Sequence, residues 1–373
     1  MSAARENTSE RLRILVVRPD RVGDVILSTP VLEVLKKHFP GSYLCVLVRE
    51  AVRPIVEGSP FVDEVMTYEP EGRHKGLGGF FRLISELRER NFRIGIVLQT
   101  QWRIGAALFG AGVRHRVGPL SKLHSFLFYN RGVRQRRSYV EMHETDYNLQ
   151  LLRRLGIRAA TRSVPVRVSV SDVAKESARK WFEGHGYTPG LEKPMIVIHP
   201  GMGGSALNWP ENHFVELARA LLKDGLTVLM TGGPTEGALL DRIRLELKTY
   251  PESQLMFYGG PTVGPIDHLA GLVSHAAVVV APSTGPLHMA VALGKPVVTF
   301  YPPIRVQSAV RWGPYLGDET QASVLVPDVY CGQDFTCKGT LCNYFPCMKS
   351  MQVTQAQEQV NRHLSRLREP KIG

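Results

Sequence analysis

Short apolar runs alternate along the chain with segments whose apolar residues recur at helical spacing, first in one half and then again in the other. The runs are rich in Val, Ile and Leu, as in RILVVR at 13–18 and MIVIH at 195–199. Parallel strands have this continuous apolar character because helices cover both faces of their sheet. The pattern therefore predicts an α/β chain with two doubly wound parallel sheets.

The expected elements fall into two similar sets. In the first half the runs predict a helix at 25–38, stopped by Pro40-Gly41, and strands at 13–18, 43–48, 65–68 and 94–98. In the second half they predict strands at 195–199, 227–231, 278–281 and 297–301, with helices at 211–223, 236–247 and 285–293. An amphipathic helix is expected at 352–367.

The domain break is expected near 165–175, where the polar run 162–172 precedes a helical segment at 173–181. This predicts an N-terminal Rossmann-like domain at 1–168. The second Rossmann-like domain, at 169–373, would end in a cysteine-rich loop and the last helix.

Composition narrows the class of protein. The 373 residues are 43% hydrophobic and 21% charged, which excludes a disordered or collagen-like chain. No window approaches the roughly 18 apolar residues of a membrane span. The first 13 residues are polar, which argues against a signal peptide, so we expect a cytoplasmic location.

Positive charge is concentrated in one part of the chain. The net charge is +12, and the stretch 71–162, with 18 Lys and Arg against 6 Asp and Glu, accounts for all of it. Such a field favours an anionic partner, namely nucleic acid, an acidic membrane face, or a phosphorylated or carboxylated substrate. A solvated basic face without a partner is the alternative.

Candidate chemistry lies directly after the predicted strands, where open α/β sheets bind ligands. Asp24 follows Gly23 at a helix start, as a cap or as a functional carboxylate. The loop 199–210 carries three glycines whose amides could hold phosphate, although it matches neither Walker A nor G-x-G-x-x-G with a helix directly after it. Glu236 could accept hydrogen bonds from ribose hydroxyls. The backbone amides of Thr284 and Gly285 could hold a diphosphate. The three junctions in the second half of the chain together favour nucleotide binding over unrelated caps and turns.

The chain resembles glycosyltransferase family 9, the ADP-heptose:lipopolysaccharide heptosyltransferases, from about residue 13 to 316. Four motifs follow in the family's order: Gly-Asp-Val with Ser-Thr-Pro at 23–30, His-Pro-Gly…Asn-Trp-Pro at 199–210, Gly-Gly-Pro-Thr-Glu at 232–236 and Pro-Ser-Thr-Gly-Pro-Leu-His at 282–288. The resemblance implies a GT-B fold, with two Rossmann-like domains facing across a cleft. It also implies an inverting, metal-independent transfer, with the acceptor on the N-terminal domain and the sugar nucleotide on the C-terminal one.

The resemblance assigns roles to matching positions. Asp24 matches the family's general base and Glu236 its ribose-binding carboxylate. The expected donor-binding residues are Gly203, Gly204, Ser205, Glu236, Ser283, Thr284, Gly285 and His288. Two positions depart from the family pattern, because Leu207 stands where many members have Lys and Ser283 where they have Asp. These departures leave the donor's identity more open than the reaction class.

The basic stretch supplies the residues expected to bind an anionic acceptor. They are Arg21, Arg114, Arg116, Arg134, Arg136 and Arg137.

Four of the five cysteines, Cys331, Cys337, Cys342 and Cys347, lie within 17 residues. Four thiolates can hold Zn or Fe, but the C-x2-C knuckle usual in such sites is missing. The spacing is compatible with a structural metal site and with reduced cysteines in a compact loop.

The residues and the resemblance together predict a glycosyltransferase that moves a heptose from ADP-heptose to a lipopolysaccharide-core-type acceptor. No cofactor is required beyond the nucleotide-sugar donor. The expected acceptor is an anionic glycolipid, which implies peripheral association with the cytoplasmic face of the inner membrane. No nucleic acid partner is expected.

Other functions remain open at this point. Within the family, the enzyme could use another nucleotide sugar as donor, or another acceptor, either a glycan or a protein. Outside it, a nucleic-acid binder would use residues 113–140 and the cysteines, but no known recognition motif accompanies them. A non-catalytic nucleotide-sugar binder is the last alternative.

Overall fold

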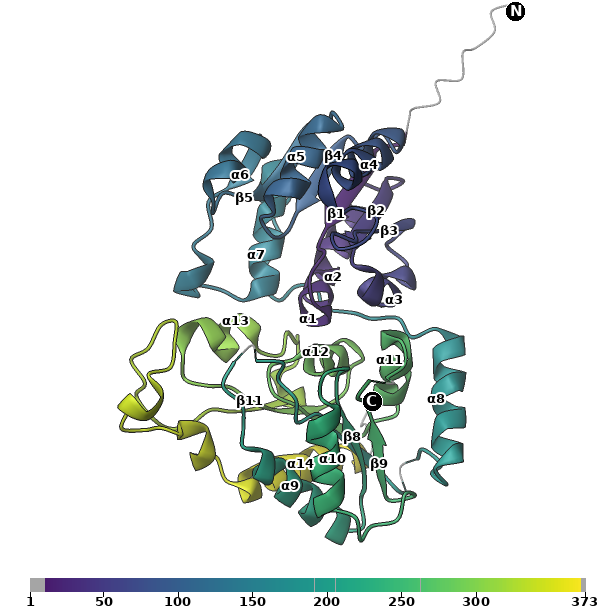
Figure 1. Cartoon of the computed structure of the whole chain (residues 1–373), viewed down its shortest axis with the longest axis vertical. Helices are drawn as coiled ribbons and strands as arrows, with labels where there is room; N and C mark the ends of the chain where they lie inside the picture. Colours follow the sequence, from purple (N-terminus) through teal and green to yellow (C-terminus); the bar gives the residue numbers. More distant parts are fainter. Residues whose placement is uncertain (1–10, 191, 205, 262, 370–373) are drawn as a thin grey trace, which may run out of the picture. The chain divides into compact units, whose positions relative to one another are not determined.

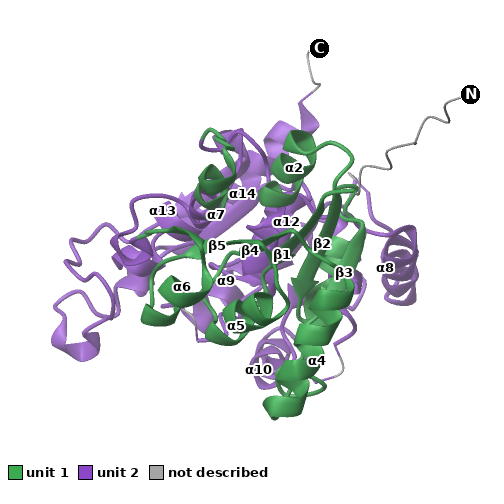
Figure 2. Cartoon of the chain, turned by 90° about the horizontal axis from the view of Figure 1, so that it is seen from above, with its two compact units in different colours: residues 1–20, 30–135, 148–160 green, residues 21–29, 136–147, 161–373 purple. Residues whose placement is uncertain are grey.

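The computed structural model describes residues 11–190, 192–204, 206–261 and 263–369. The chain forms two compact units, coloured separately in Figure 2. Of the described residues, unit 1 contains those up to 20 together with 30–135 and 148–160, and unit 2 contains 21–29, 136–147 and those from 161 onward. Unit 2 therefore includes two short segments from the N-terminal half, and one of them carries Asp24.

Unit 1 is built on a six-stranded parallel sheet with the strand order β3-β2-β1-β4-β5-β6. Its strands are β1 (Arg13–Val17), β2 (Tyr43–Val48), β3 (Glu64–Thr67), β4 (Ile94–Val97), β5 (His115–Pro119) and β6 (Arg131–Val133). The associated helices are α2 (Thr29–His38), α3 (Arg53–Glu57), α4 (Gly76–Glu89), α5 (Trp102–Gly110) and α6 (Leu123–Phe128). Strands β1 and β4 are buried on both faces, as their apolar sequences require.

Unit 2 repeats this architecture with the order β12-β11-β10-β7-β8-β9, again all parallel. Its strands are β7 (Met195–Ile198), β8 (Thr227–Thr231), β9 (Leu255–Tyr258), β10 (Val278–Val280), β11 (Val297–Phe300) and β12 (Ala322–Leu325). Its helices are α1 (Val22–Ile26), α8 (Asp172–Gly184), α9 (Glu211–Lys223), α10 (Gly237–Glu246), α11 (Ile266–Ser274), α12 (Gly285–Ala292), α13 (Ala309–Trp312) and α14 (Val353–Arg368) (Figure 1). Helix α7 (Glu144–Leu151) begins in unit 2 and ends in unit 1.

The two sheets confirm the predicted fold class. The strands expected from the long apolar runs lie within one residue of their predicted bounds. The short strands β5, β6, β9 and β12 were not predicted. Three of them, β6, β9 and β12, are edge strands, and β5 lies next to an edge. Strands β6 and β12 are only partly buried, so their sequences lack the continuous apolar run.

The single helix predicted at 25–38 is wrong, because the structure divides it into α1 and α2. Pro30 has no amide hydrogen to donate, and a proline disfavours helical geometry at the residue before it. Two hydroxyl groups satisfy carbonyls at the break: Ser28 Oγ donates to Asp24 O at 2.7 Å, and Thr29 Oγ1 donates to Ile26 O at 2.8 Å. The break makes α1 a separate short helix directly after β1.

Strand order places the expected site residues at the switch points of both sheets. In unit 1 the order reverses between β1 and β4, and in unit 2 between β7 and β10. Ligands of doubly wound sheets bind beyond the carboxyl ends of such strands. Loop 199–210 follows β7, and the turn 282–288 follows β10.

Among the described residues, no helix is long and apolar enough to cross a membrane.

Candidate functional site

The start of α1 packs against the start of α12, both within unit 2. A Cβ added to Gly23 would lie 2.9 Å from His288 Cδ2, and one added to Gly285 would lie 3.2 Å from Val22 Cβ. A side chain at either position would crowd the facing helix, so the two glycines allow this close contact. Asp24, the next residue after Gly23, therefore lies in the first turn of α1, directly beside the turn that opens α12.

His288 is buried at this contact, with 4% of its surface exposed. Burial lowers the pKa of His288 to about 3, and the nearby His143 adds to this effect. The imidazole is therefore neutral at physiological pH and can donate only one hydrogen bond. Its Nδ1 finds no hydrogen-bond partner among the residues that the structure describes. Nδ1 is itself buried, and the neutral ring brings no positive charge to the site.

His143 supports the same region through a fixed tautomer. The amide of Thr145 donates to His143 Nδ1 at 3.1 Å, so Nε2 carries the proton and donates to Gly313 O at 2.9 Å. Burial lowers the pKa of His143 to about 4. The ring also contacts Tyr315, whose hydroxyl donates to Asp146 Oδ1 at 2.7 Å. These bonds connect segment 136–147 to the 313–315 turn within unit 2.

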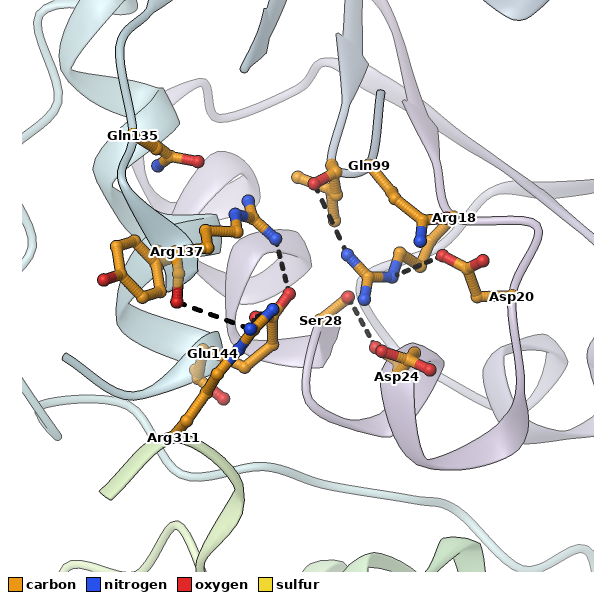
Figure 3. A network of polar contacts seen from close by, with 12 residues as sticks. Arg18, Asp20, Asp24, Ser28, Gln99, Gln135, Arg137, Glu144 and Arg311 are labelled. Carbon is orange, nitrogen blue, oxygen red and sulfur yellow. Dashed lines mark hydrogen bonds and ion pairs between the residues drawn. The ribbon is translucent and has the colours of Figure 1, made fainter. Parts of the chain in front are cut away.

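A buried carboxylate holds two arginines together. Glu144 is 1% exposed and lies between Arg137 and Arg311 (Figure 3). Arg137 pairs with Glu144 Oε1, while Arg311 approaches Oε2 with Nη2 at 3.1 Å and Nε at 3.2 Å. The guanidinium of Arg311 also lies over the Trp312 ring, 4.5 Å from its centre. Arg137, expected to bind the acceptor, is thus held in place by an ion pair.

Sequence patterns did not indicate Glu144, Arg311 or His143 as site residues. Glu144 and Arg311 are 167 positions apart. No periodicity or local spacing connects residues so distant in the chain.

Glu236 is held by the loops around it. Its Oε2 accepts a hydrogen bond from the Gly233 amide at 2.7 Å and lies 3.7 Å from His199 Nε2. A Cβ on Gly201 would lie 2.0 Å from Glu236 Oε1, so the carboxylate can occupy this position only because residue 201 has no side chain. Burial lowers the pKa of His199, and Glu236 partly opposes this shift. These contacts attach the carboxylate to the loop after β7.

The glycine loop after β7 leaves its backbone accessible. Gly203 and Gly204 are exposed and have left-handed φ angles of +56° and +71°, which favour glycine. Ser205 lies outside the described residues. Trp209 anchors the end of the loop, because its ring stacks on Phe300 at 4.2 Å and its Nε1 donates to Met351 O at 2.9 Å.

The turn after β10 leaves the first amides of α12 available. Thr284 is the N-cap residue, but its side chain makes no capping hydrogen bond and instead donates to Pro282 O at 3.1 Å. Ser283, Thr284 and Gly285 are all partly exposed. The N-terminus of a helix attracts anions through its amides and its dipole. This turn and the glycine loop both follow switch-point strands of unit 2.

The expected acceptor arginines differ in their surroundings. Arg21, Arg114, Arg134 and Arg136 are exposed. Arg116 donates from Nε to Phe128 O at 2.7 Å and from Nη1 to Val113 O at 2.6 Å. Its guanidinium is therefore bound to the backbone of unit 1. Three of the six residues belong to unit 1 and three, including Arg137, to unit 2.

The four clustered cysteines are free thiols and line one pocket, together with residues that include Leu207, Ile304, Tyr344 and Phe345. The amide of Gly339 donates to Cys337 Sγ at 3.2 Å. Burial, followed by the neighbouring cysteines, raises the pKa of Cys347. Within the described residues, no group of three or more His, Cys, Asp or Glu side chains is placed to hold a metal ion.

Comparison with known proteins gives a consistent result. The family model of glycosyltransferase family 9 (heptosyltransferase) matches residues 80–342. A Haemophilus influenzae protein described as a glycosyltransferase is 29% identical over 313 residues, covering 81% of this chain and 86% of its own length. Lipopolysaccharide heptosyltransferase 2 of Escherichia coli is 25% identical over 293 residues, 78% of this chain and 83% of that protein.

A solved structure shows the same fold. The E. coli ADP-heptose lps heptosyltransferase II matches with a TM-score of 0.77 and 22% identity, over 96% of this chain and 100% of that chain. The likeness agrees with the two doubly wound sheets described above.

The two buried histidines predict a loss of stability in acid. Their folded pKa values, about 4 for His143 and about 3 for His288, lie below the ordinary value of about 6.5. As pH falls below about 6.5, the unfolded chain binds protons that the folded chain excludes. The free energy of unfolding should then decrease by up to about 1.4 kcal/mol per pH unit for each histidine.

Denaturant titrations at several pH values from about 7 to 4 measure how the free energy of unfolding depends on pH. His288→Gln should make this pH dependence shallower, because the variant lacks a ring that burial keeps neutral in the folded chain. An identical pH dependence in His288→Gln and the wild type would contradict the assignment.

Proposed function

The chain belongs to glycosyltransferase family 9, the heptosyltransferase family, and we propose that it transfers a heptose from ADP-heptose to a hydroxyl of the lipopolysaccharide core. That it is a glycosyltransferase follows from the family. The lipopolysaccharide heptosyltransferase 2 of E. coli supports the acceptor class, and the ADP-heptose enzyme of similar fold supports the donor. We place the reaction at the cytoplasmic face of the inner membrane, where a lipid-linked acceptor is presented.

One observation carries the proposed mechanism, the glycine contact between α1 and α12. It sets Asp24 beside the turn that opens α12. In the proposed step the Asp24 carboxylate accepts the proton of the acceptor hydroxyl while that oxygen bonds to the anomeric carbon. The bond from this carbon to the diphosphate breaks with inversion, and ADP leaves with its electron pair. A general base of this kind typically contributes about 10²–10⁴ in rate.

The leaving diphosphate gains negative charge, and we assign its stabilisation to hydrogen-bond donors already in place. The amides of Thr284 and Gly285 lie at the start of α12, whose dipole favours an anion. His288 can add one N–H from its neutral ring. The exposed amides of Gly203 and Gly204 supply further donors, and Ser283 and Ser205 complete the proposed set.

Glu236 is proposed to accept hydrogen bonds from the ribose hydroxyls of the donor. The Gly233 amide fixes one of its carboxylate oxygens, which orients the group before the donor binds. Pre-orientation reduces the entropy lost on binding.

A different nucleotide sugar is the second candidate, because Leu207 and Ser283 replace residues that face the donor in related enzymes. Leu207 instead packs partly against the apolar core of unit 2 and lines the cysteine pocket. Thermal-shift measurements with ADP, UDP, GDP and CDP sugars distinguish the donors, since a ligand at about 100 times its Kd stabilises by roughly 2.7 kcal/mol. Stabilisation by another sugar nucleotide but not by ADP-heptose would replace the proposed donor.

Substitution of Asp24 tests the catalytic assignment. Asp24→Asn keeps the shape of the first turn of α1 but removes the base, so turnover should fall about 10²–10⁴-fold. Donor affinity, measured by calorimetry, should stay close to that of the wild type, because the carboxylate acts on the acceptor. Wild-type turnover in this variant would reduce Asp24 to a helix cap.

Substitution of Glu236 tests the donor site. Glu236→Ala removes hydrogen bonds to a charged acceptor, each worth roughly 1.5–3 kcal/mol, so donor affinity should fall at least tenfold. Glu236→Gln is the matched control, because its amide oxygen can still accept from Gly233 while the charge is lost. An unchanged donor Kd in Glu236→Ala would rule out ribose binding by this residue.

Transfer is proposed to need no metal, since no Asp-x-Asp sequence occurs in the second half of the chain. Turnover should therefore persist after exhaustive EDTA treatment, measured with purified donor and acceptor. Strict dependence on added Mg²⁺ or Mn²⁺ would contradict the mechanism.

A Zn or Fe ion bound by the four clustered cysteines would have a structural role, so its presence is tested separately from catalysis. Elemental analysis of wild type and Cys337→Ser addresses it. A stoichiometric metal that the variant lacks would establish a site, and a metal-free wild type would leave four reduced cysteines.

A further inference from the structure

Helices α4, α5 and α6 of unit 1 lie side by side in both views of the molecule (Figures 1 and 2). Aromatic side chains connect the helices. The rings of Phe80 and Trp102 are 6.5 Å apart between α4 and α5, and those of Phe109 and Phe128 are 6.4 Å apart between α5 and the end of α6. Glycines let the helices approach, because a Cβ on Gly105 of α5 would lie 2.9 Å from Phe128 Cβ. The three helices thus form one continuous layer.

This layer exposes large apolar side chains. Every large hydrophobic residue of unit 1 that the structure describes as exposed lies on it: Leu77 (77%), Phe81 (64%), Trp102 (57%), Phe109 (58%), Leu123 (87%), Phe126 (53%) and Leu127 (73%). We call these seven residues the apolar face. Single exposed apolar residues are ordinary, but a group confined to one layer marks an interaction surface.

Sequence spacing places the apolar residues of each helix on one side. Leu77 and Phe81 are four residues apart on α4, and Trp102 and Phe109 are seven apart on α5. On α6, Leu123 is followed by apolar residues three and four positions later. Residues at these spacings share a helix side. Each helix therefore presents an apolar stripe opposite the side that it buries.

Cations accompany the apolar face, and acidic residues are scarce. Within unit 1, the stretch 91–135, which contains α5 and α6, has seven Lys and Arg and no Asp or Glu, and the acidic residues of the three helices are Glu86 and Glu89 of α4. Lys75 and Lys122 are the N-cap residues of α4 and α6, and both are exposed, as is Arg82 on α4. A partner of this surface must accept apolar side chains and carry negative charge.

We propose that the apolar face docks unit 1 on an anionic lipid surface. Trp, Phe and Leu side chains enter the boundary between head groups and acyl chains, while flanking Lys and Arg attract anionic lipids. Since no described helix can span a bilayer, the attachment is interfacial. The three helices insert side chains rather than backbone, so no backbone hydrogen bond is broken on docking.

Two other occupants fit the charges or the side chains less well. A second copy of the chain meeting through this face would set two basic surfaces against each other, because a two-fold contact pairs a patch with itself. Nucleic acid would satisfy the cations but not Leu77, Leu123 and Leu127, which cannot stack on bases as aromatic rings do.

The biological role of this docking rests on the proposed function, because it brings the enzyme to an acceptor anchored in the membrane. The lipid interaction itself does not depend on the acceptor, so the two proposals can fail separately.

Vesicle sedimentation of the full chain tests the inference without donor or acceptor. We expect binding to phosphatidylcholine vesicles containing about one third phosphatidylglycerol, weaker binding to pure phosphatidylcholine, and a decrease with salt. Exchanging Leu123 and Leu127 together for Ser should lower the partition coefficient at least tenfold, since each buried methylene contributes to insertion. Leu245→Ser, which removes another exposed leucine (68%) from α10 of unit 2, should bind as the wild type does.

Equal binding by wild type and the double variant would overturn the inference, as would failure of the wild type to bind anionic vesicles. So would a wild-type dimer that the double variant converts to a monomer in light scattering, because the face would then join two copies. Matching unfolding midpoints confirm that the variant is folded. Turnover on a water-soluble acceptor fragment tests the proposed function separately, and it should be unaffected in the double variant.

Discussion

The close contact between α1 and α12 is the constraint on which the candidate site depends. Glycine at positions 23 and 285 lets the two helix starts meet without a side chain between them. One helix carries the proposed base, Asp24, and the other presents free amides for a phosphate group. Because α1 belongs by its contacts to unit 2, the two chemical functions are arranged within a single compact unit. A Cβ at either glycine would crowd this contact.

Burial around this contact determines which charges are available. His143 and His288 are neutral because water is excluded from both rings, so neither adds positive charge. Positive charge is instead carried by Arg137 and Arg311, which share the buried carboxylate of Glu144. Removing one partner of such a cluster leaves an unpaired buried charge, which is costly. The cluster therefore holds both arginines at defined positions beside the buried carboxylate.

The two units differ in what they expose. Unit 2 offers backbone amides in loops after its switch-point strands, which suits a nucleotide with a diphosphate. Unit 1 offers an apolar face edged by Lys75, Arg82 and Lys122. The basic residues of the stretch 71–162 therefore fall into two groups, those bound to the protein's own backbone and those exposed to solvent. Arg116 stabilises the backbone of its own unit, whereas Arg114 and Arg134 face solvent.

The sequence by itself determined the two doubly wound sheets and the junctions that carry the candidate site, because buried strands and glycine turns leave local patterns. It did not determine the break between α1 and α2, which depends on how Ser28 and Thr29 hydroxyls bond the backbone beside Pro30. Only the tertiary structure brought Glu144 to Arg311 and Gly23 to His288. Contacts between residues so far apart in the chain arise from packing, and local sequence carries no signal of them.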